Sequence, residues 1–196
     1  QHTLDVLEWP AIQSRLAAKA GSPMGRELAQ ALCPLPSLDD AKRTRNEVEE
    51  FRALLSKDNT LPFDQLFDIR ESVRRSRPEG TVLAAMDLVR VATSLEAATA
   101  IRRAIARSKE LCPQLHVIAS RLDGQTDLVE EIHAAIDAAG DVKDTASRKL
   151  TQLRLRLHEL RALIHARLQS LLTSSPLQPY IAESLVTLRN DRYVIP

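Results

Sequence analysis

The sequence predicts an all-α fold, in which a multi-helix core is followed by one long helix that ends in a small β-hairpin. Leu and Ala supply 30 and 25 of the 196 residues, whereas only 6 residues are aromatic and 5 are Gly. Leu and Ala lose little free energy on entering a helix, while sandwiches and barrels depend on β-branched and aromatic residues and on Gly-rich turns. A chain that is 44% hydrophobic and 27% charged is typical of folded rather than disordered proteins.

Prolines divide the first 60 residues into several predicted helices. Ser22 before Pro23 is a typical helix start, with a capping side chain followed by a proline in the first turn, and Pro34 stops this helix. Ser37 with Asp40 three residues later resembles a capping box and opens a charged helix. The apolar stripe expected on that helix consists of Ala41, Val48, Phe51 and Leu55.

The middle of the chain predicts one long helix between shorter ones. A short helix around 66–73 ends in the basic cluster 74–77, and an Ala-rich pattern then runs over 82–109. One face of the long helix is apolar, formed by Leu88, Val91, Leu95, Ala98, Ile101 and Ile105. Short helices are expected around 114–122 and 126–136, before a turn over 137–144 centred on Gly140.

Residues 146–173 form the clearest predicted element, a helix with a leucine seam. The seam consists of Leu150, Leu153, Leu157, Leu160, Ile164, Leu168 and Leu171, spaced by 3, 4, 3, 4, 4 and 3 residues. This is a near-heptad repeat with one slip after Ile164. Twenty-eight helical residues reach ~42 Å, which is longer than a small domain is wide, so we expect a projecting rod.

The last twenty residues change character and predict a β-hairpin. Two β-type runs, 185–188 and 193–195, flank the segment Arg189-Asn190-Asp191-Arg192, in which Asn190 and Asp191 tolerate the positive φ of a tight turn. An isolated hairpin is only marginally stable, so its further strands are expected after Pro196 or in a partner. Since the first residue is Gln rather than Met, we expect a piece of a longer protein. The expected domains are a core (1–145), a long helix (146–175) and the start of a truncated domain (176–196).

Positive charge is concentrated on the seam-bearing segment. Residues 1–145 contain 19 basic and 23 acidic side chains, whereas residues 146–173 contain six basic side chains and only Glu159 as an acid. His158 and His165 add to this charge at lower pH. Either a solvated helix face or a surface for a polyanion accounts for the pattern.

The sequence contains no recognisable catalytic, cofactor-binding or metal-binding motif. Neither G-x-x-x-x-G-K-[ST] nor G-x-G-x-x-G occurs. His158-Glu159 begins a zinc-protease pattern, but Ala162 stands where the second His belongs, and His165 lies ~10 Å further along the helix. Acidic pairs such as Glu49-Glu50 indicate solvated helix faces. We therefore expect no catalytic, cofactor or metal residues, and no enzyme activity of this chain alone.

The two cysteines, Cys33 and Cys112, are far apart, and neither belongs to a C-x-x-C motif. They are expected to be small core residues of a protein in a reducing compartment, which indicates the cytoplasm. No apolar run reaches the length that spans a bilayer, so no membrane partner is expected.

The segments at both ends of the chain resemble the MutS-two family, bacterial MutS paralogues that lack the mismatch-reading domain. Residues 186–196 read VTLRNDRYVIP, which closely resembles the family signature V-T-x-R-[ND]-[GD]-R-Y-V-[IV]-P. The opening segments 3–9 and 22–28, and the segments 64–71 and 140–147, are also similar to family patterns. The sequence departs from the usual Asn-Gly of the hairpin by having Asp191.

The resemblance implies a helical core, then a lever helix that carries a clamp. In the family, an ATPase domain and a nuclease domain follow, so ATP and Mg are expected there and no cofactor is expected in this chain. Family members are homodimers that encircle nucleic acid. They suppress homologous recombination by binding and cleaving branched DNA, and in some bacteria they rescue collided ribosomes.

Within this chain, the resemblance and the charge pattern together indicate phosphate-contacting residues. A clamp that grips any duplex needs sequence-independent, salt-sensitive contacts. Arg189 and Arg192 of the predicted hairpin are the first candidates. Weaker candidates on the predicted lever are Lys149, Arg154, Arg156, Arg161 and Arg167.

Three functional hypotheses follow. The first is the core, lever and clamp portion of an ATP-dependent protein that binds double-stranded or branched DNA without sequence specificity and suppresses recombination. The second is a ribosome-rescue factor whose clamp grips ribosomes or ribosomal RNA. The third is a stand-alone helical module that dimerises through the leucine seam.

Overall fold

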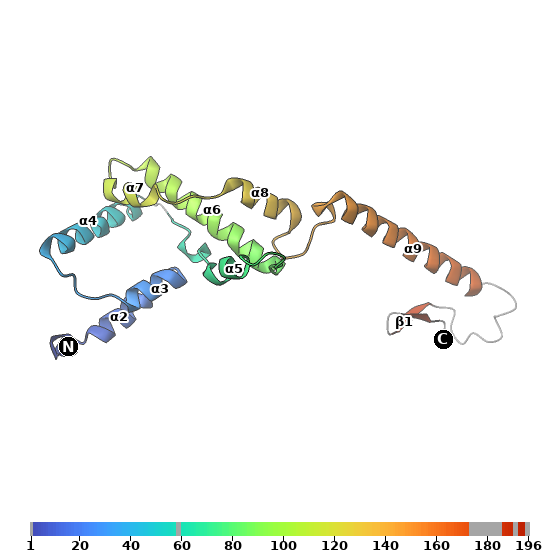
Figure 1. Ribbon diagram of the computed structural model, residues 1–196, viewed down its shortest axis with the longest axis horizontal. Coiled ribbons are helices and arrows are strands. Elements are labelled where there is room, and N and C mark those ends of the chain that lie inside the picture. Colours follow the sequence, from blue (N-terminus) through green and yellow to red (C-terminus); the bar gives the residue numbers. More distant parts are fainter. Residues whose placement is uncertain (1, 58–59, 173–185, 190–191, 195–196) are drawn as a thin grey trace. The chain divides into compact units, whose positions relative to one another are not determined.

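The computed structural model describes residues 2–57, 60–172, 186–189 and 192–194. The chain divides into two compact units, Gln1–Val142 and Lys143–Pro196 (Figure 1). The prediction of an all-α fold with one short hairpin is confirmed. The expected domain boundaries at residues 145 and 175 stay a prediction.

The described residues of the first unit form a series of helices. In chain order they are α1 (His2–Val6), α2 (Trp9–Ala17), α3 (Pro23–Gln30), α4 (Leu38–Leu55), the short 3-10 helix η1 (Phe63–Gln65), α5 (Arg70–Arg75), α6 (Ala85–Arg107), α7 (Pro113–Ala119) and α8 (Thr126–Ala135). The long helix expected over 82–109 is α6, and the two short helices expected after it are α7 and α8.

Two predicted helix starts are confirmed by their capping hydrogen bonds. The Ser22 hydroxyl accepts a hydrogen bond of 3.1 Å from the backbone N–H of Gly25 at the start of α3. At the start of α4 the Ser37 hydroxyl accepts a bond of 3.1 Å from the Asp40 N–H and donates one of 2.6 Å to the Asp40 carboxylate. These bonds satisfy N–H groups that the first turn of a helix leaves without partners.

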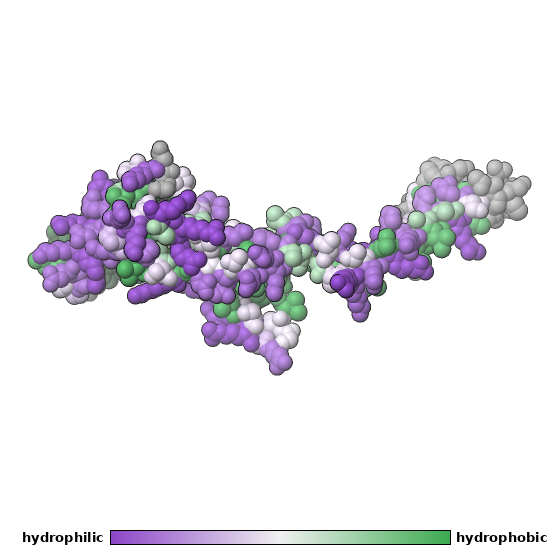
Figure 2. All heavy atoms as spheres, turned by 90° about the horizontal axis from the view of Figure 1, so that it is seen from above, coloured by the Kyte–Doolittle hydropathy of each residue, from purple (hydrophilic) through white to green (hydrophobic). Residues whose placement is uncertain are grey.

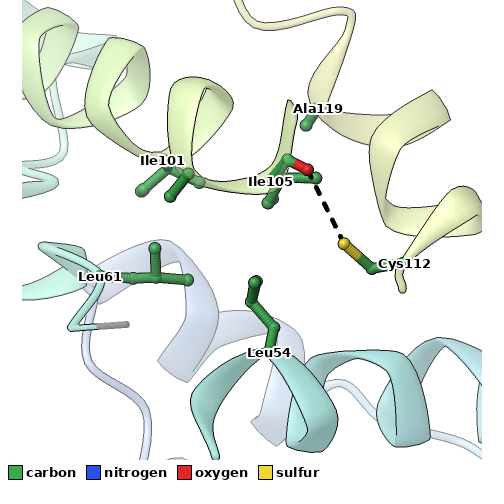
Figure 3. Close-up of a cluster of buried hydrophobic side chains, with 7 residues drawn as sticks. Leu54, Leu61, Ile101, Ile105, Cys112 and Ala119 are labelled. Carbon is green, nitrogen blue, oxygen red and sulfur yellow. Dashed lines mark hydrogen bonds between the residues drawn. The ribbon is translucent and has the colours of Figure 1, made fainter. Parts of the chain in front are cut away.

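Helix α6 contributes to both hydrophobic clusters of the first unit. In the first cluster, Leu54 of α4 and Leu61 lie opposite Ile101 and Ile105, with Cys112 beside Ile105 (Figure 3). In the second cluster, α6 packs against α8; its buried members are Val91, Ala92, Val129 and Ile132. The predicted apolar face of α6 is thus largely confirmed, since Val91, Ile101 and Ile105 are buried and Leu88 and Leu95 are partly buried.

Two expectations about the core are wrong. On α4 the fully buried residue is Leu54, while Leu55 and Val48 are exposed, so the buried stripe is rotated from the expected one. Cys112 is buried as expected, but Cys33 is exposed in the loop after α3. The buried face of α4 can shift by one residue because Leu54 and Leu55 are adjacent at the end of the helix. Only tertiary packing determines which of the two leucines is buried.

The turn predicted around Gly140 closes the first unit. Gly140 has φ +87°, a left-handed conformation that favours glycine. Its N–H donates to the Asp137 carbonyl at 3.1 Å, and the Asp137 carboxylate accepts a bond of 2.9 Å from the Asp141 N–H. Ile136 and Val142 form an antiparallel bridge across this turn.

The second unit consists of the short 3-10 helix η2 (Asp144–Ala146), the long helix α9 (Arg148–Leu172) and two strands. The 25 residues of α9 correspond to a length of ~38 Å. Strand β1 (Thr187–Arg189) pairs antiparallel with β2 (Arg192–Val194), which confirms the predicted hairpin pairing. The turn residues Asn190 and Asp191 lie outside the described residues. Among the described helices, none is both long and apolar enough to cross a membrane.

Candidate nucleic-acid interface

The N-terminal end of α9 is fixed by the segment immediately before it. The Ser147 hydroxyl accepts a hydrogen bond of 3.1 Å from the Leu150 N–H, which is an N-terminal cap. The Thr151 hydroxyl donates to the Asp144 carbonyl at 2.7 Å, and the Arg154 guanidinium forms an ion pair with the Asp144 carboxylate. Arg154, one of the predicted phosphate contacts, is therefore engaged in holding η2 against the first turns of α9.

Most of the surface of α9 is open. Of its 25 residues, all of which the structure describes, only Leu172 is buried. Leu153 and Leu157 of the seam are 58% and 48% exposed, and Leu163, outside the seam, is 64% exposed. In Figure 2, hydrophobic patches lie beside hydrophilic ones along this helix, towards the right of the view.

The remaining predicted cations of α9 differ in their contacts. Arg156 forms an ion pair of 3.1 Å with Glu159, three residues further along the helix. Within the part of the chain that the structure describes, Lys149, Arg161 and Arg167 take part in no ion pair, and all three are exposed. Exposed ion pairs such as Arg156–Glu159 contribute little stability, so Arg156 remains accessible to an anion.

The two predicted hairpin arginines are brought together by the strand register. Arg189 is the last residue of β1, Arg192 is the first of β2, and the register pairs these two residues directly. The two positions thus share the turn end of one hairpin, as the sequence predicts.

One hollow in the second unit includes two of the predicted cations. It has a volume of about 630 Å³ and lies along the first half of α9, where Asp144, Thr151, Arg154, Leu155, Leu157, His158 and Arg161 line it. Arg161 and His158 can donate hydrogen bonds to an anion in this hollow, whereas Arg154 is already paired with the Asp144 carboxylate. Over the described ranges, no cluster of three or more His, Cys, Asp or Glu side chains is placed to hold a metal ion.

The structure reveals a charged network in the first unit that the sequence pattern did not predict. Arg70 binds the carboxylate of Asp68, two residues earlier, and also Glu27 of α3 at 2.6 Å. The hydrogen bond from the Arg70 side chain, followed by the one from its backbone N–H, lowers the pKa of Asp68 to about 2. Glu27 belongs to the segment 22–28, and Asp68 and Arg70 belong to the segment 64–71. The network therefore connects two of the segments that resemble family patterns, through a contact between α3 and α5.

A second feature missed by the sequence is the role of Glu50, which is not a solvated residue as expected. Its carboxylate accepts hydrogen bonds of 3.0 Å from the backbone N–H groups of Gln114 and Leu115 at the start of α7. Cys112, the residue in the capping position, provides no side-chain cap of its own. Burial and then the charge of Glu50 raise the pKa of the Cys112 thiol. Glu50 therefore caps α7 from α4, a contact across 64 residues that no local pattern reveals.

His133 also has a partner that spacing did not indicate. Its Nε2 lies 3.0 Å from a carboxylate oxygen of Glu96, across the α6–α8 contact. The pair lies on the surface and belongs to the packing of the first unit rather than to the basic surface of α9.

The comparison with curated proteins matches the chain from end to end, whereas no family model matches it. The chain is 34% identical over 199 residues to the Endonuclease MutS2 of Bacillus velezensis, and 33% identical over 199 residues to that of Geobacillus thermodenitrificans. The Endonuclease MutS2 of Pelotomaculum thermopropionicum is 34% identical over 190 residues, or 97% of this chain. The chain spans about a quarter of the length of these relatives. The predicted resemblance to the MutS-two family is confirmed: over nearly its whole length, this chain is similar to about one quarter of proteins named Endonuclease MutS2.

Proposed function

We propose that this chain is the core, lever and clamp portion of a cytoplasmic MutS-two protein that binds branched DNA without sequence specificity and thereby suppresses homologous recombination. The observation that carries the proposal is the end-to-end match to relatives named Endonuclease MutS2, which includes the segment VTLRNDRYVIP. The proposal extends to the rest of the protein: a homodimer in which ATP, Mg and the nuclease chemistry belong to other domains.

In this proposal the hairpin supplies the principal DNA contacts. A protein that grips any duplex must contact phosphates, because these are the groups that all sequences share. The strand register that pairs Arg189 with Arg192 supports the assignment, since it puts two cations at one end of the hairpin.

The cations of α9 are secondary candidates for the same role. Lys149, Arg161 and Arg167 are favoured within this set, since they lie in no ion pair among the described residues. Arg154 and Arg156 already have carboxylate partners in Asp144 and Glu159, which a phosphate would have to displace.

The salt dependence of DNA binding tests the assignment of the hairpin. The 196-residue chain is titrated with a labelled four-way junction and with a linear duplex, from about 50 to about 300 mM salt, a range over which affinity falls steeply with the number of phosphate contacts. Arg189→Glu together with Arg192→Glu is expected to weaken binding to both DNAs. The slope of log affinity against log salt should fall by about 2, because each phosphate contact contributes about 0.9.

The matched control is Lys42→Glu together with Arg45→Glu, which makes the same charge change at exposed positions of α4. It should leave the slope unchanged. An unchanged slope in the hairpin variant, or an equal fall in the control, contradicts the proposal. Displacement of the junction by equimolar ribosomes would redirect the proposal to ribosome binding.

A further inference from the structure

Two hollows on the surface of the first unit share part of helix α6. The first, of about 670 Å³, lies between α6 and α8, which are side by side in Figure 1. The second, also of about 670 Å³, continues along α6 towards the end of that helix. Ala100 and Arg103 line both hollows, so the two are parts of one groove, which we call the α6 groove.

The α6 side of the groove is a row of residues on one helix face. The row consists of Glu96, Ala100, Arg103 and Arg107. Their spacings of 4, 3 and 4 place them within about 60° of the helix circumference, at 100° per residue. All four are exposed, so the groove is an open surface. Small-molecule sites bury most of their ligand, and an open groove is therefore better suited to part of a macromolecule.

The two ends of the groove belong to segments of opposite charge. Residues 102–121, which include the end of α6 and all of α7, contain five basic side chains and one acidic one. Residues 122–142, which include α8, contain six acidic side chains and no Lys or Arg. The hollow beside α8 therefore lies next to an acidic segment, and the hollow at the end of α6 lies in a basic one.

Three charged side chains that line the groove have no partner among the residues that the structure describes. Arg103, Arg107 and Glu130 form no hydrogen bond or ion pair there, whereas Glu96 lies 3.0 Å from His133. A cation in the last turn of a helix complements the helix dipole, which accounts for Arg107 but not for Arg103, one turn earlier. Two cations and one carboxylate are thus available to a ligand that carries both signs of charge.

A nucleic-acid backbone does not match this arrangement. Phosphates recur along the whole strand, so a duplex in the groove would bring negative charge against Glu96 and Glu130 as well as to the arginines. Unfavourable pairs of like charge exclude a ligand as effectively as favourable pairs select one. A protein segment can instead carry opposite charges at its two ends, and the planar guanidinium of arginine forms paired hydrogen bonds with carboxylates.

We propose that the α6 groove binds an extended segment of a partner protein, in which a basic residue lies three to five positions from two acidic residues. The acidic side chains pair with Arg103 and Arg107, and the basic one pairs with Glu130. The spacing follows from the length of the groove: Glu96 lies ~10 Å along the helix from Arg103 and ~17 Å from Arg107, which an extended chain covers in three to five residues. The groove belongs to the first unit and shares no residue with the proposed DNA contacts.

Three fluorescent 12-residue peptides test this inference on the 196-residue chain. All three have the same Ser and Ala positions; the mixed peptide has Lys at position 4 and Glu at positions 8 and 9, the acidic peptide has Glu at all three, and the basic peptide has Lys at all three. Anisotropy at low salt should show the mixed peptide binding about 3-fold more tightly than the acidic one and about 10-fold more tightly than the basic one, since these lose one and two charge pairs. Both differences should shrink at high salt because exposed charges are screened.

Charge-reversed variants identify the residues responsible. Arg103→Glu with Arg107→Glu should shift the preference to the basic peptide, because the groove then carries only acids. Glu130→Lys should shift it to the acidic peptide. The matched control, Lys42→Glu with Arg45→Glu, makes the same charge change as the arginine variant at exposed positions of α4 and should leave the order of the three peptides unchanged. Circular dichroism checks that every variant keeps its helices.

Four results would overturn the inference. Equal binding of the three peptides, or binding of none, would show that the groove selects no segment of mixed charge. Tightest binding of the acidic peptide by the unchanged chain would remove Glu130 from the site. A control that alters the order as much as the arginine variant would assign the effect to overall charge. A larger loss of affinity for duplex DNA than for the mixed peptide, on reversing Arg103 and Arg107, would assign both arginines to nucleic acid.

Discussion

The two longest helices of the chain have similar lengths but opposite relations to their surroundings. Helix α6 has 23 residues and buries seven of them, whereas α9 has 25 residues and buries one. Four of the seven buried positions of α6 are Ala or Ser, and small side chains let neighbouring helices approach closely. Helix α9 instead repeats leucine between arginines. Apolar residues therefore recur at similar spacings in both helices, although α6 is packed within its unit and α9 has an open face. The size of the apolar residues and the charges beside them distinguish the two helices.

The largest expected contrast comes from truncating one leucine in each unit. Leu54 is 0% exposed within the cluster that α6 forms with α4 and α7, so Leu54→Ala should lower the free energy of unfolding by about 2–5 kcal/mol. Leu157 is 48% exposed, so Leu157→Ala should change it by less than about 1 kcal/mol. Urea denaturation measures both. Equal losses would contradict the distinction between a packed and an open helix.

Adding one methyl group tests the close packing around α6. A Cβ at Gly124 would lie 1.7 Å from the Thr99 hydroxyl, so Gly124→Ala should destabilise the chain by about 1–3 kcal/mol. The double variant Gly124→Ala with Thr99→Ala should recover much of this loss, because it removes the obstructing atom. Thermal denaturation of Gly124→Ala, the double variant and the unchanged chain measures the recovery, and a double variant no more stable than Gly124→Ala would refute the steric explanation.

The capping of α7 by Glu50 predicts a smaller effect. Glu50→Ala should cost about 1 kcal/mol, since two N–H groups at a helix start lose their acceptor. Glu159→Ala on α9 removes only an exposed ion pair and should change stability by about 0.5 kcal/mol or less. Urea denaturation again compares the two, and a larger effect at Glu159 would contradict the assigned roles.

The smallest effect concerns the network of Asp68, Arg70 and Glu27. The pKa of Asp68 is lowered to about 2, so its contribution to stability is fully present above the unfolded value of about 3.9 and is lost as the pH falls through about 2. Arg70→Gln should return this pKa towards its ordinary value. Carboxyl chemical shifts followed through an acid titration measure it, and a pKa that stays low in the variant would remove Arg70 as the cause.

Local patterns predicted much of the fold because they depend on neighbours in the sequence. Apolar residues spaced by 3 and 4 located α6 and α9. Ser22 and Ser37 marked helix starts, because each hydroxyl caps an N–H group only three residues later in the sequence. Features that depend on distant residues were not predictable. Leu54 rather than Leu55 is buried because α6 and α7 cover that side of α4, and Glu50 caps a helix 64 residues away.

The candidate site divides in the same way. The positions of the α9 cations beside the seam follow from helix geometry, so the sequence alone locates them. The ion pair of Arg154 with Asp144 depends on how η2 folds onto α9, which spacing does not determine. The sequence located Arg189 and Arg192 in a hairpin, whereas the register that pairs these two residues directly comes from the structure.

Hydrogen exchange of the 196-residue chain with and without a mixed-sequence DNA duplex tests most directly whether the second unit holds the DNA contact. The proposal predicts slower exchange on DNA binding in residues 186–194, and unchanged exchange in α6 and α8. Slower exchange confined to residues 2–142, or none anywhere at saturating DNA, would contradict it.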